Sequence, residues 1–515
     1  MRASHTIDLP LSWQAIAGVA RGLDVVLSEP AKDRIRRSRD AAEKLMSDNT
    51  RCYGLNTGVG GLCNEVIAPS DRSRLSENIA FSHHVGVGQP LSREQTRGLL
   101  AAKINLYALG YSGIRLEVVE RLCAFLDNDC LPVIPAKGSL GYLSHSAPVA
   151  LSVFGEGDVF LRGERMTASQ ALSELGLAPL QLEAKEGLSL VSGTGCASGF
   201  AALALSHAHM LLDWADAAAA MSFENLRCDP EGLSARTLAL RPSPDMATVG
   251  EALRFYLRGS QLAQGPGLNP TQPPLSLRAI SQVHGGVRRA VRMSGETLDL
   301  ELASCTDNPA IWEDNGEVHM ASQAHTVAAE LAMSLDSLAL ALAHIGVISE
   351  RRIDRLVNPM VSNLPAFLAA AGGLHNGFQI AHYTAVSLVG ENRRLAQPSS
   401  LDGGVTAGLQ EDYLAHATPS ALKALDLLEN IETILAIELL CAAQAYDVQP
   451  CGAQGKRGHG TEGIYQYIRE AIGAYDDRRP LAKDIEMMRR LMWMMPYPAS
   501  MASNVSLSPT QKPEV

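Results

Sequence analysis

The clearest helical signal in the chain lies in residues 418–450, TPSALKALDLLENIETILAIELLCAAQAYDVQP, which hold neither glycine nor proline between Pro419 and Pro450. Thr418 is suited to cap this helix, and Pro419 is suited to its first turn. Apolar side chains recur there at helical spacing: Leu422, Leu425, Leu428, Ile431 and Leu435. At a rise of about 1.5 Å per residue, the predicted helix approaches roughly 40 Å in length.

Other segments extend this helical pattern along the chain. Residues 322–357 and 196–223 each contain a single glycine and no proline. Ser92-Arg-Glu-Gln95 has the pattern of a capping box, which opens a helix that is expected to end at Gly110. Strand signals are few and short, such as Asp158–Leu161. The predicted fold class is therefore mainly α, a bundle of long helices.

The chain shows no flexible linker, charge block or internal repeat that would divide it. We therefore expect one continuous architecture over residues 1–515. Within it, residues 1–195 are expected to form an N-terminal lobe that carries the active site, and residues 196–515 the central bundle and C-terminal helices. Glycine and proline gather in three loops where chemistry is expected: residues 53–61, 132–148 and 265–274.

Composition limits the possible partners. Charged residues make up 19% of the chain, below the roughly 25% of an ordinary soluble domain. Sparse charge in a chain this long indicates that some of its surface is buried between subunits. Since 44 basic and 55 acidic residues give a net charge of −11, a broad surface for nucleic acid or an anionic membrane is not expected.

Three further features point to a cytoplasmic protein. Nine scattered cysteines without a C-x-x-C pair are typical of reduced thiols. The first residues lack the apolar run of a signal peptide. No uncharged apolar run reaches the roughly 18 residues of a membrane span, because Asp336 and His344 interrupt the best candidate, residues 335–348.

Local motifs leave the chemistry open. Gly58-Val-Gly60-Gly61 lacks the Lys-Ser/Thr of a phosphate loop and is interpreted as a tight turn. Tyr53, just before it, either packs in the core or presents its hydroxyl in a cleft as an acid or base. Arg278 either anchors an anion or lies on the surface, and Arg351-Arg352 are predicted to form structural ion pairs.

The local histidine and serine patterns are equally unspecific. His83-His84 and His207/His209 lack the spacing and carboxylates of a metal site, so no metal is predicted. Ser144 stands beside His145 but without the G-x-S-x-G turn that a serine nucleophile requires.

Taken in order along nearly the whole chain, the motifs resemble the histidine and aromatic amino acid ammonia-lyase family. The resemblance implies a mostly helical homotetramer of the fumarase/aspartase-like type, with active sites assembled from several subunits around a small zwitterionic substrate. It implies neither a nucleic acid nor a membrane as a partner. The matching segments are Tyr53-Gly-Leu-Asn-Thr-Gly-Val-Gly60, Ser82-His83, Gly86-Val-Gly88, Lys137-Gly-Ser-Leu-Gly141, Ala147-Pro148, Gly155-Glu-Gly157, Lys185-Glu-Gly-Leu188, Gly193-Thr194, Ser276-Leu-Arg278 with Gln282, Asp307-Asn-Pro309, Ser349-Glu-Arg-Arg352, Leu364-Pro365, Asn376-Gly-Phe378 and Gln410-Glu-Asp412.

The departures from the family pattern are concentrated in one function. Family members cyclise an Ala-Ser-Gly tripeptide into the electrophile methylidene-imidazolone, but this chain reads Tyr142-Leu143-Ser144 there. Leu143 has no hydroxyl to eliminate and Ser144 replaces the flexible glycine, so the ring is not expected to form. At the next position, where the family has Asp, this chain has His145, and where the family has Tyr before Ser276 it has Leu275. The family's Phe-His-Gly-Glu segment appears as Thr326-Val-Ala-Ala329.

The retained positions serve the substrate. By resemblance, Tyr53 is the base that removes a β-proton and Arg278 holds the substrate carboxylate with a bidentate fork. His83 and Glu411 are expected to contact an imidazole-like ring. Further substrate-binding candidates are Ser192, where the family has Asn, and Gln379 and His382, which fall near a substrate-pocket segment.

This pattern predicts a substrate whose amine leaves without help. A trimethylammonium group cannot add to the electrophile because its nitrogen has no lone pair, and it leaves directly as neutral trimethylamine. We therefore expect a lyase that acts on a histidine betaine without a cofactor. The pattern resembles the ergothionases, which split ergothioneine into trimethylamine and thiolurocanate.

Alternatives remain at this stage. One is another electrophile-free lyase or isomerase on the same fold, and another is a non-catalytic homologue that acts as a binding partner. A conventional ammonia-lyase requires the ring-forming tripeptide. Tyr142 either offers an aromatic face to the quaternary cation or is an apolar plug that fills the vacated volume.

Overall fold

The computed structural model describes residues 4–48, 50–264, 272–401, 403–450, 455–495 and 498. The protein is mainly helical, as predicted, and its described strands form four small sheets. Two compact units are present. Unit 1 comprises Met1–Ser206, Met293–Ser337 and Pro398–Leu425, and unit 2 comprises His207–Arg292, Leu338–Gln397 and Asp426–Val515. Unit 1 thus includes the whole of the expected lobe of residues 1–195.

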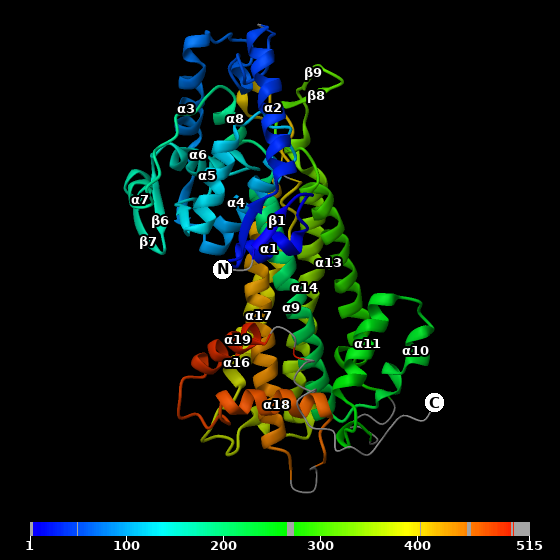
Figure 1. Ribbon diagram of the computed structural model, residues 1–515. Coiled ribbons are helices and arrows are strands. Elements are labelled where there is room, and N and C mark those ends of the chain that lie inside the picture. Colours follow the sequence, from blue (N-terminus) through cyan, green and yellow to red (C-terminus); the bar gives the residue numbers. More distant parts are fainter. Residues whose placement is uncertain are drawn as a thin grey trace. The chain divides into compact units, whose positions relative to one another are not determined.

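The long helices α9, α13, α14 and α17 confirm the strongest sequence signals (Figure 1). They span Gly195–Asn225, Ile280–Leu302, Ala329–Val357 and Ala417–Asp447. The start of α14 differs from the expected residue 322, because Ala328 adopts a left-handed conformation (φ 51°) that breaks the helical path. The predicted cap at Thr418 is also wrong, since α17 already begins at Ala417 and the Thr418 hydroxyl donates to the carbonyl of Gly141.

Unit 1 is built around α4, Arg93–Ala108, which the predicted capping box of Ser92 and Gln95 opens. Every residue of α4 from Thr96 to Ala108 is buried, and the helix packs against α1. The other helices wholly within this unit are α1 (Trp13–Ala20), α2 (Glu29–Ser47), α3 (Arg72–His83), α5 (Leu116–Asp127), α6 (Leu143–Val153), α7 (Ala168–Glu174) and α8 (Glu186–Val191).

The strands of unit 1 form short pairs at the edges of these helices. Strand β6 confirms the predicted strand Asp158–Leu161 and pairs antiparallel with both β4 and β7. The remaining pairs are β1 with β2, β3 with β5, and β8 with β9. Their bounds are β1 Ser4–Ile7, β2 Asp24–Leu27, β3 Val87–Pro90, β4 Cys130–Pro132, β5 Pro135–Lys137, β7 Glu164–Thr167, β8 Ala310–Asp314 and β9 Glu317–Ala321.

Unit 2 contains a buried polar network that confirms the structural role expected of the paired arginines. Arg352 donates to both carboxylate oxygens of Glu438, at 2.6 and 2.9 Å, and both side chains are fully buried. Ser222 and Ser349 also donate to Glu438. The helices wholly within this unit are α10 (Ala235–Ala239), α11 (Pro244–Tyr256), α12 (Leu275–Arg278), α15 (Pro359–Ser362), α16 (Gln379–Leu395), α18 (His459–Ala471) and α19 (Leu481–Met494).

Two helical stretches, Glu186–Asn225 and His325–Val357, are long and apolar enough to cross a membrane by length and composition alone. The second stretch contains residues 335–348, the candidate that Asp336 and His344 interrupt, and the first was not expected from the sequence. All of the apolar window in the first stretch is buried within the protein, and 56% of that in the second. Burial of this extent is also typical of core helices.

Candidate active site

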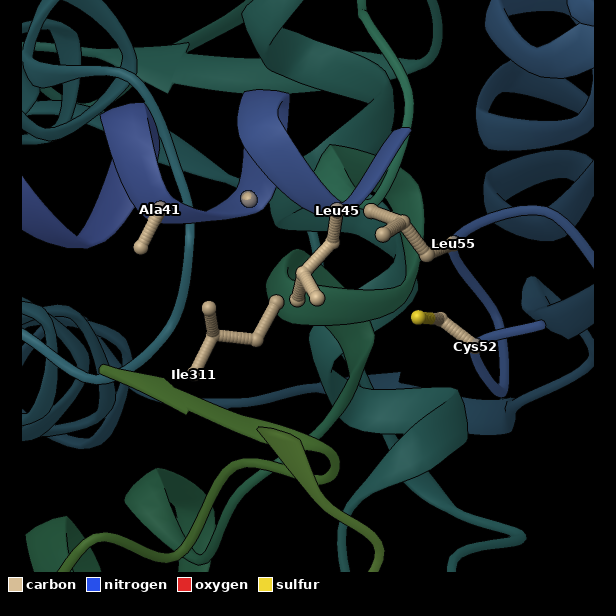
Figure 2. Close-up of a cluster of buried hydrophobic side chains, with 6 residues drawn as sticks. Ala41, Leu45, Cys52, Leu55 and Ile311 are labelled. Carbon is tan, nitrogen blue, oxygen red and sulfur yellow. The ribbon is translucent and has the colours of Figure 1, made fainter. Parts of the chain in front are cut away.

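The loop that carries Tyr53 is anchored on both sides of the tyrosine. Its neighbours Cys52 and Leu55 are fully buried in a cluster with residues of α2 and with Ile311 of β8 (Figure 2). The backbone N–H of Cys52 donates to Asn56 Oδ1 at 2.8 Å. Gly54 has φ 62°, and a Cβ atom there would lie 2.2 Å from Leu188 Cδ2, so this turn requires glycine. The packing therefore fixes the backbone of Tyr53.

The Tyr53 hydroxyl accepts a hydrogen bond from the backbone N–H of Gly60 at 2.9 Å. Burial raises the pKa of Tyr53, the Gly60 N–H opposes that rise, and the Glu411 carboxylate adds to it. The base role inferred by resemblance requires a lowered pKa. Among the described residues, therefore, the Gly60 N–H is the group that favours the phenolate.

Glu411 lies on a loop that packs against the loop of Tyr53. The 3₁₀ turn Ala407–Leu409 contacts the turn Gly60–Leu62, and a Cβ atom on Gly61 would lie 2.7 Å from the carbonyl oxygen of Ala407. Glu411 pairs with Thr406 in a short β-bridge. The start of this loop is held by Asp336, which accepts from the backbone N–H groups of Ser399 and Ser400.

Tyr142, Leu143 and Ser144 occupy the beginning of α6, so the expected loop of residues 132–148 ends at Tyr142. The Tyr142 hydroxyl donates to Thr326 Oγ1 at 3.2 Å, and Ser144 Oγ donates to the carbonyl of Gly138 at 2.6 Å. Leu143 is 39% exposed. Two residues that depart from the family pattern, Tyr142 and Thr326, are therefore joined by a hydrogen bond.

Tyr53, Tyr142 and Glu411 lie within electrostatic reach of one another. Burial raises the pKa of Tyr142, and the charge of Glu411 adds to this rise. The same carboxylate of Glu411 adds to the rise in the pKa of Tyr53.

His145, which follows the tripeptide position, is a neutral group in an apolar setting. Its side chain is fully buried, and neither ring nitrogen has a hydrogen-bond partner within the part of the chain that the structure describes. Burial lowers the pKa of His145, although the nearby carbonyls of Ala136 and Pro135 oppose this. The ring packs edge-on against Phe200 at 6.2 Å. The acidic residue that, by resemblance, the family has at this position is therefore replaced here by an uncharged side chain.

Ser192 is buried and held by its neighbours. Its hydroxyl accepts from the backbone N–H of Asn308 at 3.3 Å, and its carbonyl accepts from Lys103 Nζ at 2.9 Å. Lys103 is fully buried in α4, and burial lowers its pKa to about 8. Lys103 was not among the predicted site residues, although a single lysine inside the mostly apolar sequence of α4 indicates a special position.

His83 ends α3 and is half-buried. Its Nδ1 lies 3.1 Å from Ser82 Oγ, and burial lowers the pKa of its imidazole. A neutral ring here is suited to hydrogen bonding with another heterocycle. The described residues include no cluster of three or more histidine, cysteine, aspartate or glutamate side chains able to hold a metal ion.

Arg278, Gln379 and His382 lie in unit 2. Arg278 ends α12, is exposed, and has no ion-pair partner among the described residues. Gln379 is the first residue of α16. His382 Nε2 lies 2.8 Å from Glu350 Oε1. The predicted loop 265–274 lies outside the described residues as far as residue 271.

The comparisons with known proteins establish the family. The pattern of the aromatic amino acid lyase family matches residues 11–470, and the chain belongs to this family. Histidine ammonia-lyase of Deinococcus radiodurans is 40% identical over 487 residues, which cover 94% of this chain and 92% of that protein.

Two solved structures share the fold. Histidine ammonia-lyase of Trypanosoma cruzi superposes with a TM-score of 0.89 at 33% identity, covering 97% of this chain and 95% of that one. The ergothioneine-degrading enzyme ergothionase of Treponema denticola, solved with desmethyl-ergothioneine sulfonic acid, superposes with a TM-score of 0.88 at 28% identity. That match covers 97% of this chain and 99% of the ergothionase.

Proposed function

We propose that this protein is a carbon–nitrogen lyase that releases trimethylamine from a histidine betaine, with ergothioneine as the first candidate and thiolurocanate as its product. The proposal goes beyond the family membership. The observation that carries it is the sequence Tyr142-Leu143-Ser144 where ring-forming members have Ala-Ser-Gly. The hydrogen bond from Tyr142 to Thr326 fits a site adapted to the absence of the electrophile.

The reaction balances without a cofactor. The phenolate of Tyr53 takes the β-proton, and the electrons of that C–H bond form the carbon–carbon double bond. The bond from the α-carbon to nitrogen breaks, and its electrons leave with neutral trimethylamine. No electrophile is needed because the quaternary nitrogen already carries a positive charge.

Each retained residue has a role in this proposal. The Gly60 N–H stabilises the phenolate of Tyr53. Arg278, with no ion-pair partner among the described residues, is suited to bind the substrate carboxylate through two parallel hydrogen bonds. The neutral imidazole of His83 and the carboxylate of Glu411 are assigned to the substrate ring, and Ser192, Gln379 and His382 remain candidates for its further contacts.

The proposal includes a cytoplasmic homotetramer with shared active sites. Met333, Leu340 and Val347 recur every seven residues along α14 and are 55%, 57% and 44% exposed in the single chain. An exposed apolar row with this period is the pattern of a helix that packs against a partner helix. Sedimentation analysis that gives a monomer at micromolar concentration would contradict this part.

The rival function is ammonia release from histidine, which the name of the 40% identical relative favours. The similarity to ergothionase supports betaine cleavage instead. The test is trimethylamine release from ergothioneine and from hercynine, the betaine without the thiol, by wild type and by Tyr53→Phe. We expect release that Tyr53→Phe abolishes; no trimethylamine from either betaine refutes the proposal.

A further inference from the structure

We infer that Gln323 is a positioning residue of the proposed active site. Its side chain joins the segment bonded to Ser192 and the turn bonded to Tyr142 into one hydrogen-bonded frame. The inference rests on the proposed function, because it gives Gln323 a part in substrate binding, and it concerns a residue to which the comparisons assign no role. Every hydrogen bond that carries the inference is formed within unit 1 of a single chain.

Gln323 lies in a stretch without regular secondary structure, yet its amide groups are bonded in three places. Its backbone N–H donates to Asn308 Oδ1 at 2.8 Å. Its Nε2 donates to the carbonyl of Asp307 at 2.6 Å, and its Oε1 accepts from the backbone N–H of His325. A side-chain amide carries a donor and an acceptor on the same carbon, so glutamine can bond to a carbonyl and to an N–H at once. The side chain of Gln323 therefore joins two segments of backbone.

The first of these segments, residues 307–308, is anchored in the core and bonded to Ser192. The backbone N–H of Asn308 donates to Ser192 Oγ at 3.3 Å. The carboxylate of Asp307 pairs with Lys185 Nζ at 3.0 Å, and both of these side chains are fully buried. Because breaking a buried ion pair is strongly destabilising, this segment is a fixed base for Gln323.

The second segment is the short 3₁₀ turn His325–Val327, which holds the hydrogen-bond acceptor of Tyr142. The first N–H of a helical turn has no partner inside the turn, and the residue that precedes this one, Ala324, supplies no side-chain cap. Gln323 Oε1 accepts from that N–H instead. The next residue, Thr326, is buried and accepts from the Tyr142 hydroxyl at 3.2 Å. Gln323 therefore fixes the backbone one residue away from this acceptor.

The frame relates two positions of the site that depart from the family pattern. By resemblance, the family has Asn where this chain has Ser192, and Phe where it has Thr326. Each hydroxyl oxygen accepts a hydrogen bond here, one from Asn308 and the other from Tyr142. Gln323 keeps the two hydroxyl groups at a fixed separation. Groups that are already ordered bind a substrate without the entropic cost of ordering them, so the frame should strengthen substrate binding.

The test measures trimethylamine release from ergothioneine by the full-length protein and by Gln323→Met, which keeps the length of the side chain and removes its amide. Gln181→Met, at an exposed glutamine in a loop of the same unit, is the matched control. A folding defect reduces the amount of active protein and hence the apparent kcat, whereas lost positioning weakens substrate binding. We therefore expect KM to rise about tenfold in Gln323→Met while kcat changes less than about threefold, with neither changed in the control.

A second comparison tests whether Gln323 acts through Thr326. Since Thr326→Val already removes the acceptor of Tyr142, adding Gln323→Met to it should raise KM further by less than about threefold. Two increases in KM that multiply in the double variant would mean that the residues act independently, and would overturn the inference.

The outcomes separate this inference from the proposed function. An unchanged KM in Gln323→Met, with the variant folded by circular dichroism, overturns the inference while the proposed function stands. If Gln323→Met does not fold, Gln323→Glu takes its place in both comparisons, because it keeps an acceptor for the His325 N–H and loses only the donor to Asp307. No trimethylamine from the wild-type protein refutes the proposed function itself, and the inference with it.

Discussion

The buried lysine of α4 allows a quantitative prediction. Lys103 is fully buried, and burial lowers its pKa from 10.5 to about 8. In the unfolded chain the lysine holds its proton up to about pH 10.5, whereas the folded chain releases it near pH 8. At 1.36 kcal/mol per pKa unit, wild type should gain about 3 kcal/mol of stability between these pH values, a gain that disappears as the pH falls back through 8.

The variant Lys103→Met isolates this contribution. It removes the titrating group, and it also removes the donor to the carbonyl of Ser192. We therefore expect the difference in unfolding free energy between wild type and variant to change by about 3 kcal/mol from pH 7 to pH 10.5, in favour of wild type at the higher pH. The variant should also lose activity at every pH, because the segment of Ser192 is less firmly held.

Urea unfolding followed by circular dichroism at several pH values measures this difference. Lys483→Met, at an exposed lysine of α19, serves as the control and should show no such change with pH. A difference between wild type and Lys103→Met that stays constant within about 1 kcal/mol would refute the reasoning, because it would mean that Lys103 keeps its proton on folding.

Three further predictions concern the loops and helices of unit 1. Tyr53→Phe should lower kcat/KM for trimethylamine release at least about 100-fold. Because burial raises the pKa of Tyr53, wild-type kcat/KM should climb with pH above neutral, and a residual rate in the variant with the same alkaline rise would contradict the base role. Gly187→Ala should destabilise the protein by about 1–3 kcal/mol, since its Cβ would lie 2.1 Å from the carbonyl oxygen of Ser76 where α3 meets α8. The melting temperature measures this loss. The control Gly232→Ala, with open space around the added Cβ, should leave the melting temperature unchanged. Tyr142→Phe and Thr326→Val should each lower the free energy of unfolding by about 1 kcal/mol, and the double variant should lose no more than either single variant. Additive losses in urea unfolding would show that the hydrogen bond between these two side chains does not contribute to stability.

Sequence patterns predicted the regular parts of the fold well. The helix expected from residue 418 onward is α17, and the capping box of Ser92 and Gln95 opens α4. These elements depend on local side-chain spacing and on caps, which a sequence displays directly. The start of α14 was missed because the left-handed backbone at Ala328 belongs to a residue type that is compatible with a helix.

The site was harder to predict, because its contacts are not local. Tyr142 and Thr326 are 184 residues apart in sequence, and nothing in either segment indicates their hydrogen bond. The role of Glu411 came from the family resemblance alone, and the position of its loop near the loop of Tyr53 depends on the packing of two irregular segments. How deeply Lys103 is buried depends on which other elements cover α4, and the spacing of apolar residues within α4 does not show this.

The central claim is that the protein eliminates a quaternary amine without the family's electrophile. Its most direct test is one reaction mixture that contains wild-type protein with equal concentrations of ergothioneine and histidine, in which trimethylamine and ammonia are both measured. The account predicts trimethylamine with no ammonia, from a chain whose intact mass equals that of its unmodified sequence. Ammonia without trimethylamine, from a chain lighter by the water lost in cyclisation, would contradict it.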